Sequence, residues 1–309
     1  MLALSTPTLP ASLLAGPSPM QLDRIMKAGT FLGKRDTDLI DQLRSTEIRA
    51  VRLNHGGTTI SLRIDFADGS RAAFKPTQVH PHSIPRKEIA AYRINRLLGL
   101  NAVPPATART VHREEIMSHL PPDALAMARK IERDTKYDEE GFTRGELSVW
   151  IPVIVDSHLD SAHGKHEWHK WLHQGLHIPQ AHASLMAQLS SMLLFDMLTD
   201  NADRFSGGNL QLSQDRETLF WMDNTFGFQV DPRGHWRCRI ALMRSQRFSR
   251  SMVAAMRKLD LNTLRAAMGD DAVLTEPEMK ALIARRDLAL KYVDKLIAHF
   301  GEERVLVFQ

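Results

Sequence analysis

The sequence has little cysteine and no long apolar run. A single cysteine, Cys238, occurs among 309 residues, so the chain cannot form an internal disulfide and a disulfide-stapled scaffold is excluded. No stretch reaches the ~18 apolar residues that a membrane span requires, and we expect no such span. The lone thiol favours a reducing compartment, so we expect a cytoplasmic protein.

The N-terminal residues lack the pattern of a secretory signal. No Lys or Arg precedes Arg24, and prolines interrupt the apolar residues of this stretch. A signal peptide has a basic start and an unbroken apolar core. We therefore expect residues 1–24 to be a flexible tail, with export as the alternative.

Charge is nearly balanced, with 40 Lys and Arg against 36 Asp and Glu. This mild basic excess favours anionic ligands. The sequence has no zinc-finger, RRM or KH signature, so we expect no nucleic-acid partner. Hydrophobic residues make up 43% and charged residues 25% of the chain, which is typical of globular proteins.

Apolar patterning divides the chain into a strand-rich and a helix-rich part. Short alternating segments predict strands over 48–53, 59–66, 71–75 and 147–155, whereas helical spacing marks 86–98, 184–198 and much of 245–300. We expect an α+β, two-lobed fold with an N-lobe over 25–150 and a C-lobe over 151–309. Polar residues gather where the two parts meet, as in enzymes that bind ligands in a cleft.

Five of these polar residues can be joined into one mechanism: Lys75, Glu88, Asp203, Asn209 and Asp223. Phosphoryl transfer needs an ammonium on the nucleotide phosphates, a carboxylate that positions it, and a carboxylate that accepts the proton of the attacking hydroxyl. It also needs oxygen ligands for a divalent metal. Hard oxygen ligands suit Mg²⁺ or Mn²⁺.

Nearby glycines offer a weaker signal. His55-Gly56-Gly57 lies between two predicted strands. Gly56 and Gly57 could lie over nucleotide phosphates, although this segment lacks the GxGxxG pattern and is equally a plain hairpin turn.

The same residues carry a resemblance to a known family. The matching segments are Ala72-Ala73-Phe74-Lys75-Pro76, the helix from Glu88 to Gly99, Val103-Pro104-Pro105 with Arg109, Asn201-Ala202-Asp203-Arg204, and Asp223-Asn224. In this order they resemble the Golgi casein kinases, atypical secretory-pathway kinases related to proteoglycan xylosyl kinase and the four-jointed kinases. The resemblance spans roughly residues 50–230.

The resemblance implies a protein-kinase-like fold, with a nucleotide-binding N-lobe and a catalytic, metal-binding C-lobe. It also implies a role for each residue. Lys75 and Glu88 would be the ion pair of the nucleotide site, Asp203 the catalytic aspartate and Asp223 a metal ligand. Asn209 is similar in position to the metal-binding Asn of broader kinase-like folds. We expect an ATP-dependent phosphotransferase that needs Mg²⁺ or Mn²⁺ and acts on a hydroxyl of a protein, a sugar or a small molecule.

Two departures keep alternatives open. Phe205 stands where the family usually has His, and Asp200 stands where Gly commonly precedes Asn201. The alternatives are a catalytically silent pseudokinase that acts as a nucleotide-binding scaffold, or nucleotidyl transfer on the same fold.

Two further clusters have no place in this mechanism. Seven histidines fall within 158–182, and a helix would align His169, His173 and His177 on one face, where they could bind a transition metal or simply face solvent. Arginines between 237 and 250 could dock an acidic substrate or form a solvated face.

Overall fold

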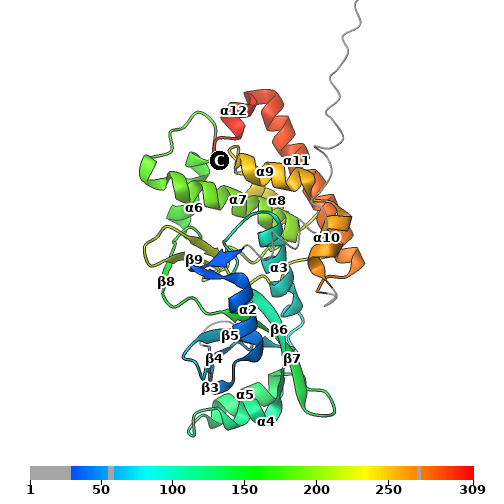
Figure 1. The fold of residues 1–309 in the computed structure, drawn as a ribbon. Coiled ribbons are helices and arrows are strands. Elements are labelled where there is room, and N and C mark those ends of the chain that lie inside the picture. Colours follow the sequence, from blue (N-terminus) through cyan, green and yellow to red (C-terminus); the bar gives the residue numbers. More distant parts are fainter. Residues whose placement is uncertain (1–28, 55–58, 270–272) are drawn as a thin grey trace, which may run out of the picture.

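The computed structural model describes residues 29–54, 59–269 and 273–309. Its first half is rich in strands and its second half in helices (Figure 1). The elements up to residue 149 are β1 (Thr30–Phe31), β2 (Lys34–Arg35), α2 (Asp36–Ser45), β3 (Ile48–Leu53), β4 (Leu62–Phe66), β5 (Arg71–Pro76), α3 (Arg86–Leu97), β6 (Ala106–His112), α4 (Arg113–Ser118), α5 (Leu125–Asp134) and β7 (Phe142–Val149). Those that follow are β8 (Ile154–Asp156), α6 (Ala162–Trp171), η2 (Gln180–His182), α7 (Ala183–Thr199), β9 (Leu210–Ser213), β10 (Leu219–Trp221), α8 (Trp236–Met243), α9 (Arg250–Lys258), α10 (Leu261–Met268), α11 (Glu276–Phe300) and α12 (Glu302–Val305).

A five-stranded antiparallel sheet forms the first part, in the order β3-β4-β5-β7-β6. Side chains alternate between its faces, as they must in a strand. In β5, Ala72 and Phe74 are buried in the core of this part, so Ala73 and Lys75 point to the other face. The register of β5 with β7 places Lys75 opposite Glu146.

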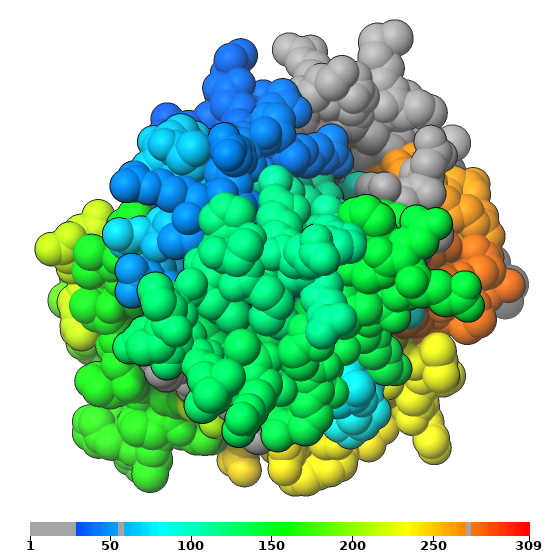
Figure 2. All heavy atoms as spheres, turned by 90° about the horizontal axis from the view of Figure 1, so that it is seen from below, coloured from blue at the N-terminus to red at the C-terminus, as the bar shows by residue number. Residues whose placement is uncertain are grey.

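Helices α4 and α5 pack on the face of the sheet that bears Ala72 and Phe74. Ile116 of α4 and Ile131 of α5 are fully buried and pack with Val51, Ile64 and other strand residues in one apolar cluster. Seen from this end, the surface is formed largely by the segment that runs from α4 to β7 (Figure 2). The face of the sheet that bears Lys75 is therefore left for a different neighbour.

The second part is built around α7. From Leu189 to Thr199 every residue of this helix is buried, and α11 packs beside it. A helix that is mostly apolar and buried on all sides belongs at the centre of a core. A small sheet in the order β10-β9-β8 lies between this core and the larger sheet (Figure 1).

Helix α3 connects the two parts. Its apolar residues Ile89 and Ile94 are buried in the same core as α7. At its first turn, Arg86 pairs with Glu278 of α11 at 2.8 Å, and Lys87 donates a 2.6 Å hydrogen bond to the carbonyl oxygen of Gly227. The helix that carries Glu88 is thus fixed to the helical part while its neighbour Lys75 comes from the sheet.

Most predicted elements are present, with one correction. The single strand expected over 147–155 is divided, because β7 ends at Val149 and β8 begins at Ile154 in the other sheet. The predicted boundaries at residues 24 and 150 stay predictions, and the tail expected over 1–24 lies outside the described residues. No helix within the described ranges is both long enough and apolar enough to cross a membrane.

Candidate active site

One ammonium group lies between two carboxylates that come from distant segments. Nζ of Lys75 is 2.7 Å from Oε1 of Glu88 and 2.9 Å from Oδ1 of Asp223. The side chains of Lys75 and Glu88 are 13% and 9% exposed, whereas Asp223 is 40% exposed. The structure therefore brings together three of the residues singled out in the sequence and leaves Asp223 accessible.

These contacts fix the charge of the site. Burial favours the neutral amine, but the charges of Asp223 and Glu88 outweigh it and raise the pKa of Lys75 well above its usual range. Burial also opposes ionisation of Asp223, yet Lys75 lowers the pKa of this carboxyl to about 2. The site thus contains an ammonium and an ionised Asp223 at neutral pH.

Asn224 holds Glu88 in position. Its backbone N–H donates to Oε1 of Glu88 at 2.9 Å, and its side-chain amide donates to Oε2 at 3.1 Å. Its own amide oxygen accepts a 2.7 Å hydrogen bond from Arg204. Because Asn224 gives Glu88 two hydrogen bonds, the carboxylate of Glu88 is fixed and can orient the ammonium of Lys75.

A further carboxyl group, Glu146, was missed by the sequence analysis. It lies opposite Lys75 in the sheet and is completely buried, and neither of its oxygens has a hydrogen-bond partner among the described residues. Burial and the negative charge of Glu88 raise its pKa well above the usual range, against the effect of Lys75. The sequence showed a glutamate directly before a predicted strand, which was a signal. It did not show the strand register that places this glutamate beside Lys75.

These groups line a cavity of about 500 Å³, which we call the Lys75 cavity. Lys75, Glu88, Glu146, Asn209 and Asp223 all contribute to it. An apolar part of its wall includes the residues Ala73, Val103, Pro104, Ala106 and Val149. The volume and the mixture of apolar wall and few polar groups are typical of small-molecule sites.

The loop over 200–209 borders this cavity. Gly207 and Gly208 line it and have φ of 97° and 76°, a region that favours glycine, so the loop can turn back tightly. The side-chain amide of Asn209 donates a 3.0 Å hydrogen bond to the backbone oxygen of Asp203. This bond orients Asn209 and leaves its amide oxygen without a described donor.

Asp223 and Asn209 are a fitting pair of donors for a hard divalent cation. One supplies an ionised carboxylate and the other an amide oxygen, and both line the same cavity. Mg²⁺ keeps several waters and takes one or two protein carboxylates together with phosphate oxygens. Within the described residues no group of three or more His, Cys, Asp or Glu side chains could hold a metal, so a metal at this pair would complete its coordination with waters or phosphate oxygens.

Asp203 is close in sequence to residues that line the Lys75 cavity but does not lie in its wall. Its side chain is half-buried and is not among the residues that line the Lys75 cavity. Arg204 anchors the loop: it is buried, forms an ion pair with Asp196 at 3.0 Å, and donates to the carbonyl oxygens of Asn209 and Met222. Asp203 therefore lies in a loop that its neighbour Arg204 ties to α7 and to the start and end of the β9–β10 hairpin.

Asp200 and Phe205, the two residues that depart from the family pattern, each make a defined contact. Asp200 has φ of 59°, the left-handed conformation that favours Gly but that Asp also adopts, and its carboxylate accepts a 2.5 Å hydrogen bond from the backbone N–H of His235. The ring of Phe205 stacks on Trp168 of α6, with centroids 5.9 Å apart. Neither substitution disturbs the contacts of Lys75.

Two other predictions have different outcomes. Gly56 and Gly57 lie outside the described residues. The row of His169, His173 and His177 is not formed, because α6 ends at Trp171 and the later two histidines follow the helix. The described histidines accordingly form no three-ligand metal site.

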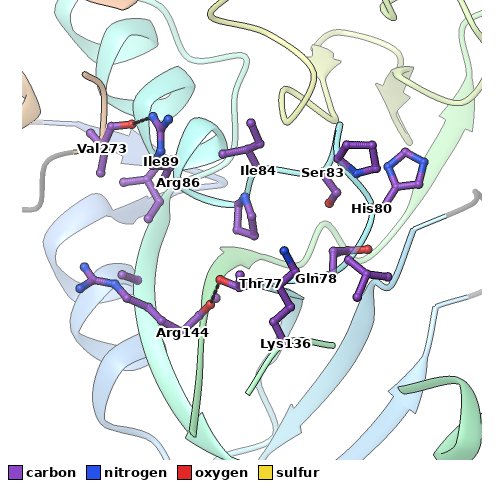
Figure 3. Close-up of a pocket in the computed structure, with 15 residues that line it drawn as sticks. Thr77, Gln78, His80, Ser83, Ile84, Arg86, Ile89, Lys136, Arg144 and Val273 are labelled. Carbon is purple, nitrogen blue, oxygen red and sulfur yellow. Dashed lines mark hydrogen bonds between the residues drawn. The ribbon is translucent and has the colours of Figure 1, made fainter. Parts of the chain in front are cut away.

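A second cavity of about 500 Å³ lies at the start of α3 and shares no lining residue with the Lys75 cavity. In Figure 3, Thr77 and Gln78 border it from the segment after β5, Lys136 and Arg144 border it from below, and Arg86 contacts Val273 at its edge. Its walls contain no carboxylate from the described residues. It therefore lacks the carboxylates that the Lys75 cavity brings together.

Comparison with known proteins supports the fold. No protein-family model matches the sequence, and no curated protein matches it. A solved structure described as hydra Fam20 with sugar is similar with a TM-score of 0.68 at 17% identity, covering 92% of this chain and 97% of that chain. The Golgi casein kinase with Mn/ADP bound has a TM-score of 0.67 at 15% identity, covering 88% of this chain and 78% of that chain.

The chain has the fold of the Golgi casein kinase. The predicted resemblance is confirmed at the level of the fold, as is the two-lobed, kinase-like architecture with a strand-rich N-lobe and a helical C-lobe. In this fold Lys75 comes from the N-lobe sheet, whereas Asp223 and the loop over 200–209 come from the C-lobe. The Lys75 cavity lies where these segments meet.

Proposed function

We propose that this protein is an ATP-dependent kinase that transfers the terminal phosphoryl group to a hydroxyl. The observation that carries the proposal is the ammonium of Lys75 held between Glu88 and Asp223 at the wall of a ligand-sized cavity. The fold is that of a kinase solved with Mn and ADP, which supports a nucleotide and a divalent metal as ligands.

Different residues of the Lys75 cavity would bind the base, the phosphates and the metal. The apolar wall around Val103 and Ala106 would receive the base, and Lys75 would bind phosphate oxygens under the control of Glu88. Asp223 and Asn209 would hold Mg²⁺ or Mn²⁺, which neutralises phosphate charge when it is bound.

Asp203 would accept the proton of the attacking hydroxyl. The hydroxyl oxygen forms a bond to the terminal phosphorus while the bond to the bridging oxygen breaks, and ADP leaves. General-base assistance of this kind contributes about 10²- to 10⁴-fold to a rate. Arg204 keeps the loop of Asp203 in place through its ion pair with buried Asp196.

The test is ATP turnover by the full chain with Mg²⁺ or Mn²⁺, with Asp203→Asn as the matched variant. We expect metal-dependent turnover in the wild type, about 10²-fold or more slower turnover in the variant, and equal ADP binding by both. Mass spectrometry of the acceptor then identifies the adduct.

Two outcomes contradict the proposal. If wild type and Asp203→Asn bind ADP and are equally silent across metals and acceptors, the protein is a nucleotide-binding scaffold. A nucleotide adduct in place of a phosphate adduct means that the reaction is nucleotidyl transfer.

A further inference from the structure

A cavity of about 580 Å³ lies beside the loop of Asp203, and we call it the Trp236 cavity. Ala202, Phe205 and Ser206 of this loop line it. Gly207, Gly208 and Asn209, which follow directly, line the Lys75 cavity instead. The loop that carries Asp203 therefore borders both cavities.

The charged or titratable side chains among the described residues that line the Trp236 cavity are all nitrogen groups, and the hydroxyl of Ser206 is neutral. Lys165 and His169 of α6 face it from one side, and Arg237 and Arg244 of the α8 segment from the other. No carboxylate from the described residues lines it, and no described acidic side chain forms an ion pair with Lys165, Arg237 or Arg244. Burial and the charge of Arg244 lower the pKa of His169, so the positive charge near neutral pH comes from the other three.

Aromatic rings supply the remaining wall. Trp236 is 54% exposed, an unusual position for so large a ring, and Phe205 stacks on buried Trp168. Both rings already carry a cation on a face: Lys165 lies 5.6 Å from the centroid of Phe205, and the guanidinium of Arg237 lies 5.6 Å from that of Trp236. A flat ligand group could stack here while an anionic group meets the same cations.

We propose that the Trp236 cavity binds the acceptor, a small hydroxyl compound that carries a flat ring and an anionic group; this inference rests on the proposed kinase function. The volume is that of a drug-sized ligand site. A ligand held there would place its hydroxyl beside the loop of Asp203. Phe205, the residue that departs from the family pattern, then serves as part of the acceptor wall.

Three matched compounds test the chemistry: para-hydroxymethylbenzoate, para-hydroxymethylphenyl phosphate and para-hydroxymethylbenzamide. Their binding is measured by calorimetry with the full chain, both free and loaded with ADP and Mn²⁺, and their phosphorylation is measured by mass spectrometry. We expect at least one anion to bind about tenfold more tightly than the amide and to react faster, because two or more cations would contact it. The preferred anion shows whether a carboxylate or a phosphate is recognised.

The double variant Arg237→Gln with Arg244→Gln should abolish the preference for the anion and leave ADP binding unchanged. Arg239→Gln is the matched control, because Arg239 is exposed on the same helix but does not line the cavity. Trp236→Ala should weaken binding of all three compounds, since it removes the ring and not a charge.

The outcomes separate this inference from the kinase function. Absence of ADP binding in the wild type contradicts both. Normal ADP binding with equal affinity for acids and amide, or with an anion preference that survives in the double variant, overturns the inference alone. Phosphorylation of an acidic serine peptide without binding of the small anions also overturns it.

Discussion

The Lys75 cavity and the Trp236 cavity are bordered by one loop and have opposite charge patterns. The first gathers the carboxyl groups of Glu88, Glu146 and Asp223 around a single ammonium. The second gathers cations around aromatic rings, of which Trp236 is exposed, with no carboxylate among the described residues of its wall.

This difference indicates how each cavity would meet an anion. Carboxylates repel a polyphosphate unless a divalent cation accompanies it, so the Lys75 cavity suits a metal–nucleotide complex. No carboxylate lies among the described residues that line the Trp236 cavity, so its cations can meet an anionic group directly. If the two cavities act independently, a change in one leaves binding in the other unaltered.

The largest effect is expected for Asp223→Ala. Asp223 is the most exposed carboxylate in contact with Lys75 and lies at the candidate metal position. We expect metal-dependent turnover to fall on the order of 10³-fold, while Lys75 keeps its contact with Glu88 and the fold persists. Binding of para-hydroxymethylbenzoate should be unchanged.

The measurement is the initial rate across a series of Mn²⁺ concentrations. Asp215→Ala, which removes an exposed carboxylate in the turn between β9 and β10, is the control. Full activity of the Asp223 variant at saturating Mn²⁺ would remove this residue from the metal site.

A smaller effect is expected for Lys75→Met. The variant leaves Glu88 without its cation in a largely buried site, and breaking such a pair costs about 3 kcal/mol of stability. ADP binding should also weaken by about 10- to 100-fold, because the phosphates lose their ammonium partner. Mn²⁺ should restore part of the lost stability by supplying positive charge.

Urea denaturation and calorimetry check both effects. Lys34→Met, at an exposed cation of the N-lobe, serves as the comparison. Unchanged stability together with unchanged ADP affinity would show that the ion pair has no part in nucleotide binding.

Local patterns were sufficient to place each member of the central ion pair, and the family resemblance implied that the two would meet. Strand alternation places Lys75 on the face opposite Phe74, and Glu88 lies in the first turn of a helix whose apolar residues were visible in the sequence. The position of Asp223 after an apolar strand was equally readable. These features depend on a few neighbouring residues, so the sequence alone reveals them.

Features that depend on long-range packing were not predictable. Glu146 meets Lys75 only through the register of two strands far apart in sequence. The histidine row failed because the helix ends at Trp171, where Leu172 turns into the core. The Trp236 cavity combines α6 with α8, and nothing in either segment alone indicates the other.

The smallest effect concerns stability and pH, through Glu146→Gln. Burial raises the pKa of Glu146, so the native state retains a proton that the unfolded chain releases above its ordinary value of 4.5. Stability supplied by this group is complete below that value and is lost as pH rises toward the native pKa. Glutamine cannot titrate, so the variant should lose less stability between about pH 5 and pH 8.

Urea denaturation at several pH values in EDTA measures this slope without bound metal, and Glu139→Gln, at an exposed carboxylate before β7, is the control. Parallel curves for wild type and Glu146→Gln would mean that Glu146 ionises normally. A flatter curve for Glu146→Gln alone would show that Glu146 keeps its proton beside Lys75 in the native state. A carboxyl group that resists ionisation there would mean that further negative charge enters the Lys75 cavity more readily together with a cation, as in the proposed metal–nucleotide complex, whereas the Trp236 cavity has three cations in its own wall.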